Sequence, residues 1–167
     1  MSNFNLDNLI RDNIRSLVPY ASARSEYSGQ DVIYLDANEN SLGSAYNRYP
    51  DPLQQQLKTA IASIKNVRKE CIYLGNGSDE PIDLLIRSFC NPGRDNILVF
   101  PPTYGMYEVS AQINDVAVKK INLTADFQLD LPAALQAIDA QTKLIFICSP
   151  NNPTGNLIDA ESIQQVL

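Results

Sequence analysis

Residues 143–156 read KLIFICSPNNPTGN, an apolar segment followed by a turn rich in proline and asparagine. Lys143 to Cys148 is typical of a fully buried strand, because the run is short and rich in Leu, Ile and Phe. Pro150 and Pro153 fix their own φ angles and favour an extended conformation of the preceding residue. Gly155 then allows a left-handed turn. The stretch predicts a rigid strand end that presents asparagine amides, with an ordinary surface loop as the alternative.

The chain from residue 30 onward alternates predicted strands with predicted helices. Short apolar runs predict the strands, and apolar residues at helical spacing predict the helices. This alternation is typical of an α/β fold with a mostly parallel sheet flanked by helices. The strands are expected at 32–35, 71–74, 97–100, 116–123 and 143–148, and the helices at about 53–64, 82–89, 104–113 and 131–138 and from Asp159 onward.

The first thirty residues differ from this pattern. They contain one amphipathic stretch, at about 9–17, followed by an irregular segment. We therefore predict an N-terminal arm or small-domain segment at 1–30 and the first part of a large domain at 31–167. The last residues, 163–167, look like a helix that has only just begun, which indicates truncation of a longer chain.

Composition and charge exclude several classes of function. The chain has 167 residues, of which 44% are hydrophobic, enough for one domain with a sizeable core. Its net charge of -6, without a run of Lys or Arg, argues against nucleic acid as a partner. The start has no continuous hydrophobic segment, so we expect a cytoplasmic protein with no membrane span. The absence of histidine excludes histidine metal sites and Ser-His-Asp or Cys-His catalysis.

The three cysteines have no spacing typical of a metal site. Each lies in an apolar context, so we expect buried free thiols. They are Cys71, Cys90 and Cys148.

A second strand end, LGNGSDEP at 74–81, is suited to an anion. Gly75 and Gly77 allow a tight turn, and the first amides of the following helix have no partners within it. Such a helix start binds phosphate well, although Ser78 or Asp79 acting only as a helix cap is the alternative. The spacing is neither GxGxxG nor a nucleotide loop with Gly-Lys-Ser/Thr. The Asp79 carboxylate would disfavour a phosphate unless its side chain points away.

A third strand end, FPPTYGMY at 100–107, places an aromatic ring beside these groups. Tyr104 could stack on a flat heteroaromatic ligand, with a core tyrosine as the alternative. The three strand ends together offer a phosphate cradle, an aromatic plate and an amide donor. These groups match a phosphorylated pyridine ring with a phenolic oxygen. We therefore predict that the chain binds pyridoxal 5'-phosphate.

Six segments of the chain resemble one known family, in the same order along the sequence. They are PYASARSEY, YLDANENS, NRYPDP, GNGSDEPIDLLIRSF, PPTYGMYEVSA and SPNNPTGN. They look like the amino-terminal half of fold-type I, pyridoxal-phosphate-dependent aminotransferases, most closely the histidinol-phosphate aminotransferase family. The resemblance covers nearly the whole chain and implies a truncated large domain.

The resemblance also implies roles for individual residues. The backbone amides of Ser78 and Asp79 would hold the cofactor phosphate, Tyr104 would stack on the pyridine ring, and Asn152 would donate to the phenolate oxygen. Tyr49 would reach the cofactor phosphate of the neighbouring subunit in a homodimer. The alternative for Tyr49 is a plain turn residue. Asn38 and Glu39 could likewise be only turn or capping residues. The substrate side would be lined by Tyr20, Asn38, Glu39 and Asn40.

The implied activity belongs to histidine biosynthesis: amino-group transfer between glutamate with 2-oxoglutarate and imidazole-acetol phosphate with histidinol phosphate. The alternatives are an aromatic aminotransferase, a threonine-phosphate decarboxylase, or a non-catalytic cofactor-binding module. The family's cofactor-binding lysine lies in a Ser-x-Ser-Lys context that this chain lacks, so we assign no catalytic residue and expect the 167-residue chain to be inactive alone. All six lysines are interpreted as solvated surface groups: Lys58, Lys65, Lys69, Lys119, Lys120 and Lys143.

Overall fold

The computed structural model describes residues 5–21, 33, 35 and 37–167. The chain divides into two compact units. The first consists of Met1–Ser16 and Gly75–Leu167, and the second of Leu17–Leu74. The division at residue 30 into an arm and a large domain stays a prediction.

The first unit is built on a three-stranded parallel sheet with the order β2-β1-β3. The strands are β1 (Asn96–Val99), β2 (Ala117–Lys120) and β3 (Thr142–Phe146). The central strand pairs in parallel with both neighbours, which confirms the predicted α/β class. β1 is buried along its whole length, whereas every residue of β3 is half-buried. The prediction of a fully buried strand at Lys143 to Cys148 is therefore wrong, because β3 has a hydrogen-bonded neighbour on one side only among the described strands.

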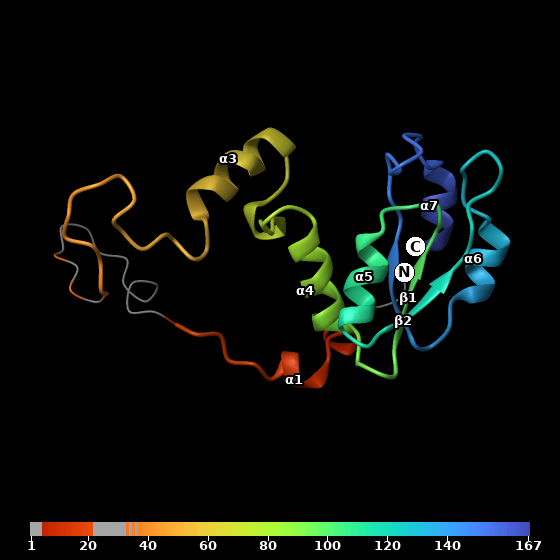
Figure 1. Ribbon diagram of the computed structural model, residues 1–167, viewed down its shortest axis with the longest axis horizontal. Coiled ribbons are helices and arrows are strands. Elements are labelled where there is room, and N and C mark those ends of the chain that lie inside the picture. Colours follow the sequence, from red (N-terminus) through yellow and green to blue (C-terminus); the bar gives the residue numbers. More distant parts are fainter. Residues whose placement is uncertain (1–4, 22–32, 34, 36) are drawn as a thin grey trace. The chain divides into compact units, whose positions relative to one another are not determined.

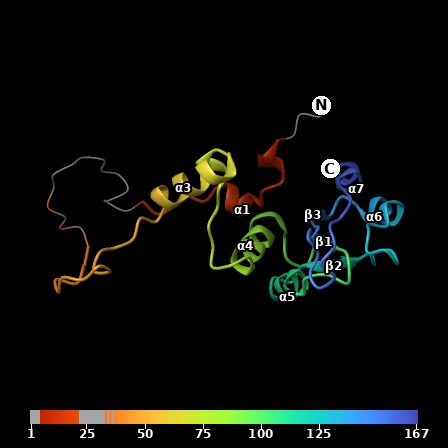
Figure 2. The same ribbon diagram turned by 90° about the horizontal axis from the view of Figure 1, so that it is seen from above.

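Helices cover both faces of this sheet (Figures 1 and 2). Successive side chains of a strand point to opposite faces, and β1 follows this rule. Ile97 and Val99 belong to one apolar cluster, whereas Leu98 and Phe100 belong to another. The first cluster packs under α4 (Asp79–Phe89) and α5 (Met106–Ile113), and the second under α6 (Leu131–Ala137) and α7 (Ala160–Val166).

Local sequence explains where these helices form. Ile82 and Ile86, one turn apart on α4, are its buried residues and face the sheet. Asp130 caps α6 by accepting from the Ala133 amide at 3.2 Å. Asp159 caps α7 in the same way, accepting from the Ser162 amide at 2.8 Å. Each cap satisfies an amide that has no partner inside the helix.

The N-terminal residues contact the carboxyl end of α4. They include the short helices η1 (Leu6–Asn8) and α1 (Asp12–Arg15). The Arg11 amide donates to the Ser88 carbonyl at 3.0 Å, and its guanidinium donates to the Arg87 carbonyl at 2.7 Å. These carbonyls belong to the last turn of α4, where a positive charge is favourable.

The second unit contains α3 (Gln55–Lys65) and η2 (Lys69–Cys71), and no described side chain in it is buried. α3 confirms the predicted helix at 53–64. The predicted strand at 71–74 is wrong, since Ile72 is extended but pairs with no described strand. Of the predicted strand at 32–35, Ile33 and Leu35 are exposed and lie outside any strand, while residues 32 and 34 lie outside the described residues.

The cysteines fall into three environments. Cys90 is buried, and this burial raises the pKa of its thiol to about 11. Cys148 is half-buried, and Cys71 is exposed. The prediction of a buried thiol is therefore wrong for Cys71, because the described part of the second unit has no core into which η2 could pack.

Asp139, which follows α6, joins the edge of the sheet to the loop before β3. Its Oδ2 accepts from Lys119 Nζ at 2.6 Å, and its Oδ1 accepts from Asn96 Nδ2 at 3.2 Å and from Thr142 Oγ1 at 3.0 Å. Lys119 is therefore ion-paired and only partly exposed, which corrects its interpretation as a solvated group. The Lys119 ammonium and these donors hold the pKa of Asp139 below its ordinary value of 3.8.

We expect the Asp139 carboxylate to make stability depend on pH in acid. Because folding lowers its pKa, the contribution is complete above the ordinary value of 3.8 and is lost as the pH falls below it. Asp139→Asn should therefore lower the melting temperature of the intact protein at pH 7, and the difference from wild type should shrink below about pH 4. Asp126→Asn, at a carboxylate without a hydrogen bond in the described chain, is the control. An equal deficit at both pH values would contradict this expectation.

Candidate functional site

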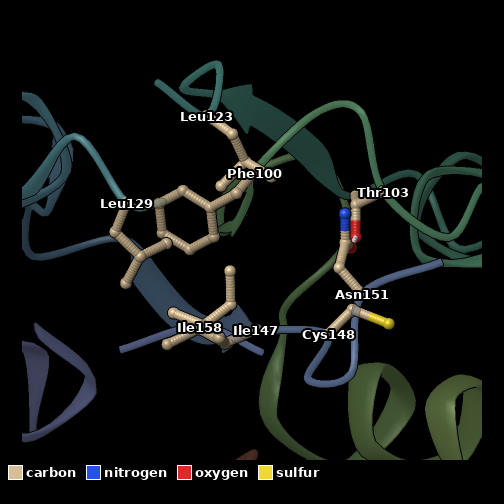
Figure 3. Close-up of a pocket in the computed structure, with 8 residues that line it drawn as sticks. All are labelled: Phe100, Thr103, Leu123, Leu129, Ile147, Cys148, Asn151 and Ile158. Atoms are coloured by element: carbon tan, nitrogen blue, oxygen red, sulfur yellow. Dashed lines mark hydrogen bonds between the residues drawn. The ribbon is translucent and has the colours of Figure 1, made fainter. Parts of the chain in front are cut away.

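The loops that follow β1 and β3 lie together at one edge of the sheet. Both strands run in the same direction, so their carboxyl ends meet at this edge, where ligands of open α/β sheets bind. Asn151 Nδ2 donates to the Pro102 carbonyl at 2.8 Å, and Thr103 Oγ1 donates to Asn151 Oδ1 at 3.1 Å. Figure 3 shows the Asn151 side chain directed at Thr103. These bonds join the two loops.

The two adjacent asparagines of the second loop have different environments. Asn151 is 4% exposed, and its side chain also donates to Thr154 Oγ1 at 2.7 Å, so both its amide protons are used. Asn152 is exposed, and its side chain makes no hydrogen bond within the described residues. Asn152 is therefore the amide available to a ligand, whereas Asn151 holds the loop. The family resemblance gives the donor role to Asn152, and the burial of Asn151 explains why Asn151 cannot take that role.

The turn that carries Asn152 is closed on itself. The Gly155 amide donates to the Asn151 carbonyl at 2.7 Å, and the Asn151 amide donates to the Asn156 carbonyl at 2.8 Å. Gly155 has a φ of 76°, which confirms the predicted left-handed conformation. The Ser149-Pro150 and Asn152-Pro153 peptide bonds are both cis. The two backbone hydrogen bonds and the Gly155 conformation show that the predicted turn is present, while its rigidity stays a prediction.

The predicted cradle lies at the start of α4. Gly77 has a φ of 70°, and a Cβ atom on Gly75 would meet the Pro81 ring at 2.8 Å. Gly77 is therefore favoured by its left-handed backbone conformation, and Gly75 by the close approach of the Pro81 ring. The Ser78 side chain makes no capping hydrogen bond. The backbone amides of Ser78 and Asp79 have no acceptor among the described residues, so they remain available to an anion.

A hydrogen bond between Tyr104 and Asp79 joins the cradle to the aromatic plate. The Tyr104 hydroxyl donates to Asp79 Oδ1 at 2.8 Å. This hydrogen bond, with the nearby negative charge, raises the pKa of the Tyr104 phenol. The Asp79 carboxylate thus accepts a hydrogen bond from Tyr104. This contact reduces its repulsion of an anion bound to the amides of the same turn. Two residues that the sequence separates by 25 positions meet here.

The space beside Tyr104 is a shallow depression of about 390 Å³ at the same edge of the sheet. Thr103, Tyr104, Tyr107 and Pro153 are among its lining residues, whereas Ser78, Asp79 and Asn152 are not. Tyr104 is half-buried, so part of its ring remains open to a ligand. A ligand that contacts all the predicted groups must therefore reach beyond the depression.

The apolar side chains drawn in Figure 3 close the opposite side of the loops. Phe100, Leu129, Ile147 and Ile158 pack together and leave no space for a water molecule. In the same view, the Cys148 thiol points away from these side chains. Asn151 lies beside this packing, which leaves no room for a ligand.

The remaining predicted residues lie in the second unit, where the structure shows local contacts. Glu39 accepts from the Tyr49 amide at 2.9 Å and forms an ion pair with Arg48. These contacts connect the two ends of the 39–49 segment. Glu39 therefore has the turn role that the sequence analysis gave as its alternative. Asn40 accepts from the Leu42 amide at 2.9 Å, which is also a turn contact.

The two tyrosines of this set and Asn38 are exposed to solvent. Tyr20 is 93% exposed, Asn38 is exposed, and Tyr49 is 56% exposed. The cofactor and substrate roles of Tyr20, Asn38, Glu39, Asn40 and Tyr49 stay predictions.

Two kinds of feature are missing from the described ranges 5–21, 33, 35 and 37–167. None of the helices there is long and apolar enough to cross a membrane. The same residues contain no group of three or more cysteine, aspartate or glutamate side chains that could hold a metal ion.

Comparison with known proteins identifies the family. The model of the family described as aminotransferase class I and II matches residues 23–167. The chain belongs to this family. It is 59% identical to the histidinol-phosphate aminotransferase of Cytophaga hutchinsonii, in an alignment that covers 98% of the chain and 48% of that protein. It is 52% identical to the histidinol-phosphate aminotransferase of Parabacteroides distasonis, which covers 97% of the chain and 47% of that protein.

A solved aminotransferase structure agrees with this assignment. The crystal structure of histidinol-phosphate aminotransferase from Clostridium acetobutylicum matches with a TM-score of 0.62 and 31% identity, covering 71% of this chain and 34% of that one. The fold is therefore that of fold-type I aminotransferases, as predicted. The chain spans about half the length of the curated relatives that it matches.

Replacing Asn151 or Asn152 with alanine should affect the free energy of unfolding differently. Asn151→Ala leaves the Pro102 carbonyl and the Thr103 hydroxyl without partners, so it should reduce the free energy of unfolding by about 1–3 kcal/mol. Asn152→Ala removes an exposed side chain and should change it by less than about 0.5 kcal/mol. Chemical denaturation of the two variants of the intact protein measures this difference. Equal losses would show that Asn151 does not hold the loop.

Proposed function

We propose that the intact protein containing this chain is a pyridoxal-phosphate-dependent aminotransferase. It exchanges an amino group between histidinol phosphate and 2-oxoglutarate, forming imidazole-acetol phosphate and glutamate. The observation that carries this proposal is the 59% identity to a histidinol-phosphate aminotransferase over 98% of the chain. A cytoplasmic homodimer, in which Tyr49 reaches the partner subunit's cofactor phosphate, is part of the same proposal.

The donors at the strand ends support pyridoxal 5'-phosphate as the cofactor. The unpartnered amides of Ser78 and Asp79 suit its phosphate, because a helix start favours negative charge. The open part of the Tyr104 ring suits the face of its pyridine. Asn152 has an unused amide that can donate to the phenolate oxygen. These residues would bind and orient the cofactor.

The bound cofactor would supply an electron sink for the carbon that loses a proton. The residues of this chain would keep the ring fixed during that step, with Asn152 stabilising negative charge on the phenolate oxygen. We propose no residue of this chain as the base that moves the proton. Lys119 and Lys120 are bound to Asp139 and Glu108, each at 2.6 Å, and no lysine follows a Ser-x-Ser sequence. Turnover is therefore proposed for the intact protein only.

Substrate profiling of the intact protein tests the activity. With pyridoxal 5'-phosphate and 2-oxoglutarate present, we expect glutamate to form with histidinol phosphate and much more slowly with aromatic amino acids. Release of carbon dioxide from threonine phosphate, or a preference for aromatic amino acids, would favour an alternative enzyme. No reaction with any of these compounds would favour a binding module.

The role of Asn152 gives a second test of the site. Asn152→Ala should reduce kcat/KM for histidinol phosphate by about 10- to 100-fold, because it removes a hydrogen bond to a charged oxygen. Asn152→Asp, which replaces the donor with a carboxylate, should reduce it at least as much. Steady-state kinetics at saturating cofactor measures both. Wild-type kinetics in both variants would remove Asn152 from the proposed site.

A further inference from the structure

A hydrogen bond fixes the Tyr104 hydroxyl but does not fix the rotation of the ring about its long axis. The hydrogen bond to Asp79 holds the oxygen at the far end of the side chain. This oxygen lies on the axis about which the ring turns, so the bond constrains the position of the ring more than its plane. The torsion about this axis has only broad intrinsic preferences. A stacking surface nevertheless needs a defined plane, because offset stacking depends on the relative orientation of two rings.

The plane of Tyr104 is set by a second aromatic ring, that of Tyr107. The two ring centroids are 5.7 Å apart and the planes meet at 85°, an edge-to-face arrangement. This is one of the preferred geometries of aromatic pairs. Tyr107 lies in the first turn of α5, three residues after Tyr104. A rotation of the Tyr104 ring about its long axis would disrupt this edge-to-face contact.

Tyr107 can set this plane because its own ring is held from behind. It stacks on Phe146, the last residue of β3, with centroids 4.7 Å apart and an interplanar angle of 16°. Both rings pack against the buried cluster beneath α4 and α5. Burial raises the pKa of the Tyr107 phenol, with a further contribution from the nearby Cys148 thiol. The ring therefore has neighbours on its face and at its hydroxyl.

We propose that Tyr107 is a positioning residue: through its edge-to-face contact it sets the plane of Tyr104, and thereby the plane in which a flat cofactor stacks. Phe146 belongs to the sheet, Tyr107 stacks on Phe146, and Tyr104 contacts Tyr107. This series of ring contacts connects the sheet to the ligand site. The carboxyl end of β3 supplies both the first of these rings and, six residues later, the Asn152 amide. The face and the hydroxyl of the ligand are thus oriented by the same strand. This inference rests on the proposed cofactor site.

The test compares two replacements of Tyr107 in the intact protein, with pyridoxal 5'-phosphate as the probe. Tyr107→Leu removes the ring, and Tyr107→Phe keeps it. The measurements are the Kd of the cofactor for the apoprotein and the visible circular dichroism of the bound cofactor, which reports its orientation. We expect Tyr107→Leu to raise Kd by about 2- to 12-fold, the value of one aromatic pair, and to change the dichroism. Tyr107→Phe should retain both wild-type values.

A double-mutant cycle shows whether the effect passes through Tyr104. In a Tyr104→Leu background, Tyr107→Leu should cause no further change in Kd or dichroism, because the ring that it positions is gone. An equal additional loss in that background would overturn the proposal, since Tyr107 would then act through general stability. Wild-type Kd and dichroism in Tyr107→Leu itself would also overturn it.

Two further variants distinguish a loss of positioning from a folding defect. If Tyr107→Leu does not fold, Phe146→Leu removes the support behind Tyr107 and should shift Kd and dichroism in the same direction; unchanged values there would overturn the proposal. Ile138→Ala truncates the apolar cluster on the opposite face of the sheet. It should lower the melting temperature and leave Kd and dichroism unchanged. Failure of the wild-type protein to bind pyridoxal 5'-phosphate would instead refute the proposed cofactor site, and so is distinguishable from failure of the positioning role.

Discussion

The site depends on one buried side chain, that of Asn151. Its amide and carbonyl groups join the loop after β3 to the loop after β1, and a third contact closes its own turn. A buried amide must satisfy its hydrogen bonds inside the protein, so this geometry is strongly specified. The exposed Asn152 and the half-buried Tyr104 are each adjacent to a residue in this network. Their placement follows from a residue that touches no proposed ligand.

A negative side chain in the phosphate cradle is compatible with the site because of its contact with Tyr104. The Asp79 carboxylate accepts from the Tyr104 hydroxyl, while the amides of Ser78 and Asp79 have no acceptor among the described residues. The start of α4 thus offers backbone donors to an anion, while the carboxylate of Asp79 points to Tyr104. The objection raised by the sequence, that Asp79 would repel a phosphate, is met by a long-range hydrogen bond that local sequence does not reveal.

The sequence predicts the helices of this chain better than its strands. α3, α4, α5, α6 and α7 lie close to their predicted ranges, because helical spacing and capping residues act within a few positions. The extended segment at 71–74 has the composition of a strand but no paired neighbour, and Cys71 beside it is exposed. A strand requires a hydrogen-bonded partner from elsewhere in the chain, so composition alone does not determine it.

The sequence by itself determined the α/β class, the family, the glycine turns at Gly77 and Gly155 and the set of candidate ligand groups. These features are local or follow from an ordered series of motifs. Only the tertiary structure decided that Asn151 ties the two loops together, that Asp79 accepts a hydrogen bond from Tyr104, and that the Tyr104 and Tyr107 rings pack edge-to-face. These depend on burial and on contacts between elements, and parallel pairing of β1 with β3 is what brings the loops together.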